Sequence, residues 1–202
     1  MTSLRHNNES AASPQDAYLD AARACILDVG WRCTTLTEVA RRAGVSRMTI
    51  YRSWADMPTL LGDLMTREWT GLVSTTVGTS DAADPLTRLV DDVVATIRAL
   101  RENELFVRIV ELDPELVLPY LLSRRGRSQD LILGLLTQAL REGQDTGAVR
   151  SGDPVSMARA MALTAHGFVL SAHTMVDGEV GADALDDELR LLLTRGLEGA
   201  RR

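Results

Sequence analysis

The sequence predicts an all-α protein of about nine helices, in which a small three-helix domain precedes a larger helical domain. Apolar residues recur at helical spacing along most of the 202 residues, and convincing strand-like alternation appears nowhere. Proline follows serine or aspartate where four of these stripes begin, as is typical of a helix N-terminus (Ser13-Pro14, Asp84-Pro85, Asp113-Pro114 and Asp153-Pro154). With 45% hydrophobic residues, a chain of this length can bury a sizeable core.

The first predicted helix runs from Pro14 to about Gly30. Ser13 can cap it, and Asp16 places a negative charge at the positive end of the helix dipole. Its apolar face consists of residues at helical spacing (Tyr18, Ala22, Cys25, Ile26 and Val29). Two cysteines, Cys25 and Cys33, are too few for a disulfide scaffold or a zinc finger, so we expect both to be small core residues.

Two short helices follow and are joined at a glycine. Thr35 and Glu38 have the spacing of a capping box, which predicts that the first of the two begins at Leu36. It should end near Ala43, because Gly44 tolerates the positive φ that a helix C-terminus needs.

The second short helix is expected to begin after Ser46, which can cap it. Ile50 and Trp54 lie four residues apart and should point inward, which leaves the polar and cationic side chains between them pointing elsewhere. The residues expected to build this helix pair are Leu36, Ala40, Gly44, Ile50 and Trp54. Ala40 is small where the helices would cross, and Ile50 fills the angle between them.

The rest of the chain reads as further helices. The expected ranges are 58–72, 85–100, 104–112, a stretch from 113 that Pro119 and residues 123–128 can kink or split, 130–142, 154–176 and 184–199. The connections at 78–84, 143–152 and 177–183 are polar and contain glycine, as is typical of loops.

Charge is unevenly distributed along the chain. Overall, 28 acidic residues outnumber 22 basic ones, giving a net charge of −6 at pH 7. The segment from Trp31 to Trp54 is different, because it holds one acidic residue, Glu38, and five arginines (Arg32, Arg41, Arg42, Arg47 and Arg52). A local basic patch on an acidic protein suits specific DNA binding. Two short helices joined at a glycine beside such a patch are the layout of a DNA-reading helix-turn-helix.

With these features the chain resembles the TetR (tetracycline-repressor-like) family of transcriptional regulators. The resemblance covers about residues 12–69 by motif, and the remainder by the number and length of helices. It rests on Gly30, Thr34-Thr35-Leu36, Val39-Ala40, Ala43-Gly44-Val45-Ser46, Thr49-Ile50-Tyr51-Arg52-Ser53-Trp54 and Leu60-Leu61. It implies a DNA-binding domain at residues 12–57 and an effector-binding and dimerisation domain at 58–202. Trp54 departs from the phenylalanine that is usual there, and Met57 from a lysine that contacts a DNA phosphate in relatives.

The resemblance also implies which side chains meet DNA. They are Thr35, Ser46, Arg47, Met48, Thr49, Tyr51 and Arg52. Thr35, Tyr51 and Arg52 are expected to contact phosphates. Residues 47–49 stand at the start of the recognition helix and are expected to touch base edges, and which of the three reads sequence stays open.

The last two long helices are candidates for a dimer interface. Small residues along 153–176 permit close helix contact, and with leucines of the final helix they could form a four-helix interface about a two-fold axis. The candidate interface residues are Ala158, Ala162, Ala165, Leu185, Leu189 and Leu192. Because one short recognition helix covers few bases, we expect a homodimer on the two halves of a palindromic operator.

Large, adaptable side chains on the helices that line the effector cavity in relatives are candidates for a pocket, with ordinary core filling as the alternative. They are Met65, Trp69, Phe106, Met157, Met161, His166 and Phe168. Few charges fall on these apolar faces, which favours a neutral, lipophilic effector. His166 and His173 would lie roughly 10 Å apart along a helix, too far for one metal ion, so neither a metal nor a cofactor is expected.

These observations favour a ligand-responsive repressor. A helix-turn-helix regulator controlled by a partner protein is the alternative, whereas an enzyme is disfavoured because the chain has no phosphate-binding glycine loop, G-x-S-x-G or metal cluster. No apolar run approaches the roughly 20 residues needed to cross a bilayer, and residues 1–13 lack a signal-peptide core, so we expect a cytoplasmic protein with no membrane partner.

Overall fold

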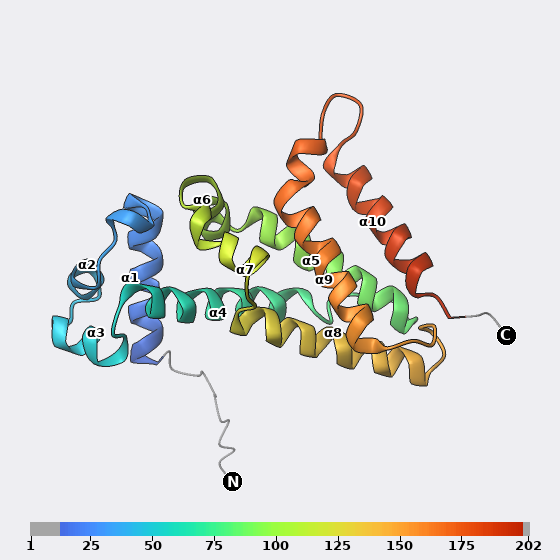
Figure 1. The fold of residues 1–202 in the computed structure, drawn as a ribbon, viewed down its shortest axis with the longest axis horizontal. Helices are drawn as coiled ribbons and strands as arrows, with labels where there is room; N and C mark the ends of the chain where they lie inside the picture. The colour runs from blue at the N-terminus through green and yellow to red at the C-terminus, as the bar shows by residue number, and fades with distance from the viewer. Residues whose placement is uncertain (1–12, 200–202) are drawn as a thin grey trace, which may run out of the picture. The chain divides into compact units, whose positions relative to one another are not determined.

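The computed structural model describes residues 13–199, and this part of the chain contains ten α-helices and three short 3₁₀ helices, which confirms the predicted all-α class (Figure 1). The α-helices are α1 (Pro14–Val29), α2 (Leu36–Arg42), α3 (Arg47–Ser53), α4 (Met57–Thr76), α5 (Pro85–Glu102), α6 (Glu104–Leu112), α7 (Leu118–Leu122), α8 (Arg127–Asp145), α9 (Pro154–Ser171) and α10 (Ala182–Leu197). The 3₁₀ helices are η1 (Trp31–Cys33), η2 (Pro114–Leu116) and η3 (Ala172–Met175). The chain divides into two compact units after Leu64, so the first turns of α4 belong to the first unit.

Helix α1 begins and ends as the sequence predicts. The Ser13 hydroxyl accepts a hydrogen bond from the backbone N–H of Asp16 at 3.2 Å, and the Asp16 carboxylate accepts one from the backbone N–H of Ser13 at 3.0 Å. Gly30 ends the helix with a φ of 80°. Both ends therefore follow from side chains within a few residues of them.

The predicted inward face of α1 is correct at its centre and wrong at its end. Cys25 and Ile26 are buried, as expected. Val29, the last residue of the helix, is 51% exposed. Cys33 is also exposed, so the expectation that both cysteines are core residues is wrong for the second. Helical spacing identifies a face, but it does not show where the packing partner of that face ends.

The core of the second unit is one apolar cluster drawn from α5, α8, α9 and α10. Helix α5 contributes the stripe that the sequence predicts (Leu86, Leu89, Val90, Val94 and Ile97). The other helices and the connection before α9 complete it with Leu140, Val149, Met157, Ala158, Met161, Leu189, Leu193 and Leu197. Each large side chain buried in this way stabilises the fold by about 1.5–3 kcal/mol. Among the described residues, no helix is both long and apolar enough to span a membrane.

Polar side chains fix the starts of several helices in this unit. The Asp84 carboxylate accepts the backbone N–H of Thr87 at 2.8 Å at the start of α5, and Asp153 accepts that of Ser156 at 3.0 Å at the start of α9. The hydroxyls of Thr87 and Ser156 donate to the same carboxylates at 2.7 and 2.6 Å, and these bonds, followed by those from the backbone, lower the pKa of both carboxyl groups. Asn103 caps α6 in the same way. The predicted starts of α5, α6 and α9 are thus confirmed.

The predicted break in the helix that follows Asp113 is also confirmed. The chain forms η2 and α7 in turn, and α8 then begins at residue 127, three residues before the predicted position. Gln129 holds this corner, because its Nε2 donates to the Tyr120 carbonyl at 3.2 Å and its Oε1 accepts the Gly126 N–H at 2.8 Å.

A buried carboxylate joins α5 to α10. Asp186 is 1% exposed, and its oxygens accept from Arg98 Nε at 2.5 Å and from Arg101 Nη2 at 2.7 and 2.8 Å. Arg98 also donates to the Asp183 carboxylate at 2.7 Å. Two arginines of one helix therefore hold the first turns of the other, and the buried carboxylate is fully paired.

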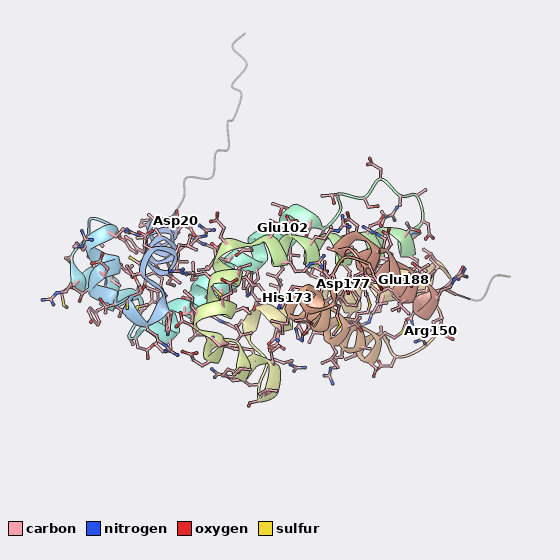
Figure 2. All side chains as sticks on the ribbon, turned by 90° about the horizontal axis from the view of Figure 1, so that it is seen from above. Asp20, Glu102, Arg150, His173, Asp177 and Glu188 are labelled. Carbon is pink, nitrogen blue, oxygen red and sulfur yellow. The ribbon has the colours of Figure 1, made fainter. Side chains whose placement is uncertain are left out.

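Close backbone contacts link the end of α8 to the end of α10. An added Cβ at Gly143 would overlap the Val149 side chain, so the position requires glycine. The Arg150 backbone N–H donates to the Leu197 carbonyl at 2.8 Å, and Arg150 Nε donates to the Gly196 carbonyl at 2.6 Å. Figure 2 labels Arg150 beside the end of α10.

Candidate nucleic-acid interface

The turn between α2 and α3 is set by the left-handed conformation of Gly44, whose φ is 68°. The Val45 N–H donates to the Ala40 carbonyl at 3.0 Å, and the Gly44 N–H donates to the Arg41 carbonyl at 3.3 Å. This pair of bonds is a Schellman motif, which satisfies the last carbonyls of α2. The turn is therefore formed by backbone hydrogen bonds and by the one residue type that adopts this conformation freely.

Thr35 caps α2 as predicted, but the reciprocal half of the capping box is replaced. The Thr35 hydroxyl accepts the backbone N–H of Glu38 at 3.2 Å. The Glu38 carboxylate instead accepts from Arg41 Nε at 2.9 Å and Nη2 at 2.6 Å, which lowers its pKa. A charged pair one helical turn apart displaces the weaker bond to the backbone.

Ser46 caps α3, and its hydroxyl is shared with a neighbour. It accepts the backbone N–H of Thr49 at 3.2 Å, and the two hydroxyl oxygens lie 2.9 Å apart in a further hydrogen bond. Thr49 is half-buried, whereas Arg47 is exposed and Met48 is 77% exposed. Of the three candidates for base contact, Arg47 and Met48 are therefore more exposed than Thr49.

Two buried side chains hold α3 against the rest of the first unit. Ile50 is fully buried, and Trp54 is 1% exposed. The indole Nε1–H of Trp54 donates to the Asp63 carboxylate at 2.8 Å, and its ring meets Tyr18 edge to face at 6.4 Å. Leu36 and Ala40 of α2 are buried in the same unit. The indole ring is thus enclosed with its polar atom satisfied.

The arginines of this unit divide into paired and unpaired groups. Arg41 is paired with Glu38, and Arg42 is paired with Asp28. Arg47 and Arg52, both exposed on α3, have no ion pair or hydrogen bond from their side chains to any residue that the structure describes. Tyr51, between them, is also exposed, at 49%. The surface of α3 therefore carries positive charge that the described chain does not neutralise.

The pocket candidates fall into separate places in the second unit. Trp69 of α4 and Phe106 of α6 meet edge to face with ring centroids 5.5 Å apart. Met157 and Met161 lie in the apolar core cluster, and Phe168 packs against that cluster. Met65 and His166 are half-buried, and burial lowers the pKa of His166, which favours its neutral form.

The dimer candidates divide according to burial. Ala158 and Leu189 are fully buried in the core of their own chain, so their side chains present no surface to a second copy. Ala162, Ala165 and Leu185 are half-buried. Leu192 is 62% exposed. Two further leucines that were not among the predicted interface residues are exposed as well, Leu163 at 70% and Leu191 at 48%. Their exposure could not be recognised from spacing, because a core leucine has the same pattern.

Comparison with known proteins identifies the family. The family model described as "Bacterial regulatory proteins, tetR family" matches residues 19–64, the segment that contains α2, the turn and α3. An uncharacterized HTH-type transcriptional regulator of Mycobacterium tuberculosis, Rv2250c, is 34% identical over 171 residues, which are 85% of this chain and 87% of the relative. This chain belongs to the TetR family of transcriptional regulators. A TetR-family protein is a DNA-binding regulator and not an enzyme.

Solved structures share the fold of this TetR-family chain. The fatty acid degradation regulator FadR from Bacillus halodurans is 22% identical, with a TM-score of 0.65 over 93% of this chain and 98% of its own. The SmeT–triclosan complex is 24% identical, with a TM-score of 0.62 over 94% and 93%. PfmR, a TetR family regulator from Thermus thermophilus, is 22% identical, with a TM-score of 0.56 over 95% and 99%. The N-terminal helix-turn-helix and the helical C-terminal part are common to this fold.

Proposed function

We propose that this TetR-family regulator is a repressor that binds a palindromic operator as a homodimer and leaves it when a small, largely apolar effector binds. One observation carries the proposal: Arg47 and Arg52 lie exposed and unpaired on α3, while buried Ile50 and Trp54 hold that helix in place. A rigid helix with an unneutralised cationic surface suits the major groove, where phosphates and base edges supply the acceptors.

Within α3, we assign base reading to Arg47 and Met48. An arginine at this position can donate twice to a guanine, and a methionine can contact a thymine methyl group. Thr49 has a lesser part in base reading, because its hydroxyl is hydrogen-bonded to Ser46 and its side chain is half-buried. Together with Ser46, it positions the start of the helix.

Phosphate contacts are assigned to Thr35, Tyr51 and Arg52. The Thr35 oxygen accepts from the backbone of α2, which leaves its O–H free to donate to a phosphate. Met57, at the start of α4, replaces a cation that holds a phosphate in relatives. With fewer charged contacts, the affinity of this protein for DNA should fall less steeply with salt.

The proposed dimer interface is the exposed face of α9 and α10. Leu163, Leu191 and Leu192 expose large apolar side chains there. Ala160 and Gly167 lie one helical turn on either side of Leu163 and are exposed too, so a second helix can approach closely. Two copies related by a two-fold axis would bury this face as a four-helix interface and present two α3 helices to the two operator halves.

The proposed effector site lies in the second unit and includes the Trp69–Phe106 pair. SmeT, which shares the fold, has been solved with triclosan. Because α4 runs from the first unit into the second, an effector that shifts the second part of α4 would change the spacing of the recognition helices. Effector binding would then favour the dimer population that does not fit DNA.

Fluorescence anisotropy with DNA enriched from a random pool tests the base-reading assignment. Arg47→Ala should weaken binding by about 1–3 kcal/mol and relax the preference at one base pair in each half-site. Arg141 is an exposed arginine on α8 without a partner in the described chain. Its replacement by alanine should change neither the affinity for DNA nor the base preference. Equal weakening by Arg47→Ala on every DNA sequence would reassign this side chain to a phosphate.

A further inference from the structure

Arg108 of α6 has a buried nitrogen without a partner. Its Nε is inaccessible to solvent and has no hydrogen-bond partner, and the residue as a whole is half-buried. No ion pair or hydrogen bond joins its guanidinium to any residue among those the structure describes, 13–199. An arginine cannot lose its charge in a protein, so this group is a permanent cation with an unsatisfied donor.

The local sequence offers Arg108 two carboxylates that it does not use. Glu104 lies four residues before it and Glu111 three residues after it, the spacings at which exposed ion pairs form on a helix. Glu111 is exposed, and Glu104 has an interaction elsewhere. Arg108 instead has its Nε buried, and Leu105 and Ile109, three residues before it and one after it on α6, are buried as well. Its orientation is therefore not explained by pairing along the helix.

The same unit shows how an inward-turned arginine is otherwise satisfied. On α5, Arg98 and Arg101 both donate to the buried carboxylate of Asp186. In native structures nearly all buried polar groups find such a partner, and an exception is often functional or reflects a bound group. Within the described residues, Arg108 has no counterpart of Asp186, so an acceptor from outside the chain is the simplest explanation.

We propose that Arg108 binds the carboxylate of the effector, whose body is apolar. A carboxylate matches a guanidinium in shape, because its two oxygens can accept from Nε–H and one terminal N–H in parallel. The surroundings on α6 fit an apolar body, because Leu105 and Ile109 lie on the same side of the helix as Arg108. This inference rests on the proposed function and replaces the neutral effector expected from the sequence with an amphipathic acid.

The first test needs no ligand. If Arg108 is kept for a ligand, its unpaired donor destabilises the free protein, and Arg108→Met should raise the melting temperature by about 2–4 °C. Arg141→Met on the exposed surface of α8 is the matched control and should leave the melting temperature unchanged. A lower melting temperature for Arg108→Met would show that the guanidinium is already satisfied in the free protein, and would overturn the inference.

The second test compares acids with neutral molecules of the same shape. Dodecanoic acid and 2-naphthoic acid are titrated against their methyl esters, with calorimetry on the full-length protein. At least one acid should bind about 10-fold more tightly than its ester, and Arg108→Met, but not Arg141→Met, should abolish the difference. Ester binding equal to acid binding, a preference that survives Arg108→Met, or no binding of either acid would overturn the inference. If either ester released operator DNA, the proposed function as an effector-controlled repressor would still hold, although the inference about Arg108 would not.

Discussion

Replacing Trp54 with phenylalanine tests how α3 is held against the first unit. The indole is 1% exposed, its Nε1–H donates to the Asp63 carboxylate at 2.8 Å, and its ring meets Tyr18 edge to face. Loss of this partly buried hydrogen bond to a charged acceptor should cost about 1.5 kcal/mol, and the smaller ring should cost about 1 kcal/mol more in lost packing. Opening of α3 should therefore become easier by about 2.5 kcal/mol, or about 70-fold.

Hydrogen exchange of peptides that cover residues 47–53 measures this opening directly. Because the chain has two units, local exchange isolates the first unit where a global unfolding curve can mix both. Asp63→Ala supplies the control, because the hydrogen bond is already absent in that background. There, Trp54→Phe should accelerate exchange only about 5-fold. The same acceleration in both backgrounds would refute the claim that Asp63 holds the indole.

Two glycines of α8 should respond to alanine in opposite directions in thermal denaturation followed by circular dichroism. Gly143→Ala should lower the melting temperature, because the new methyl group overlaps Val149, whereas Gly134→Ala meets nothing within 4 Å and should stabilise the helix by about 0.5–1 kcal/mol. Gly44→Ala should cost about 1 kcal/mol from its φ of 68° alone, and hydrogen exchange in the first unit would detect it. Asp186→Asn should destabilise the second unit by about 2–3 kcal/mol in urea, because two arginines of α5 lose their carboxylate; a cost below about 1 kcal/mol would mean that solvent replaces it.

Helix starts and turns could be predicted from the sequence because their causes are local. The caps at Ser13, Asp84 and Asp153 each act on backbone groups within three residues, and those helices begin where predicted. The turn at Gly44 needs one permissive residue and carbonyls of the preceding helix. The helix-turn-helix is a set of such local features, which explains why its two helix starts and its glycine turn could be predicted.

Partners distant in sequence could not be predicted in the same way. Trp54 and Asp63 are nine residues apart, and Arg98 and Asp186 are 88 apart, so only the packed fold brings each pair together. A residue buried in the core of its own chain and a residue buried between two copies also show the same apolar pattern in the sequence. For that reason Ala158, fully enclosed in the second unit, was indistinguishable from an interface residue.

The chemistry of the effector shows the same limit. The sequence favours a neutral ligand, because few charges fall on the apolar faces of the helices that carry the pocket candidates. The structure leaves Arg108 paired with neither Glu104 nor Glu111 and buries its Nε. The conformation of the Arg108 side chain determines whether its guanidinium is solvated on the helix surface or available to bind an anion. Residue spacing in the sequence does not determine that conformation.

Selection of bound DNA from a random pool, followed by the mass of the purified complex, tests the central claim most directly. We expect an enriched inverted repeat bound by two copies of the chain, with enrichment lost when Arg47 and Arg52 are both replaced by alanine. No enriched sequence, or a single copy bound to an asymmetric site, would contradict a dimeric DNA reader built on α3.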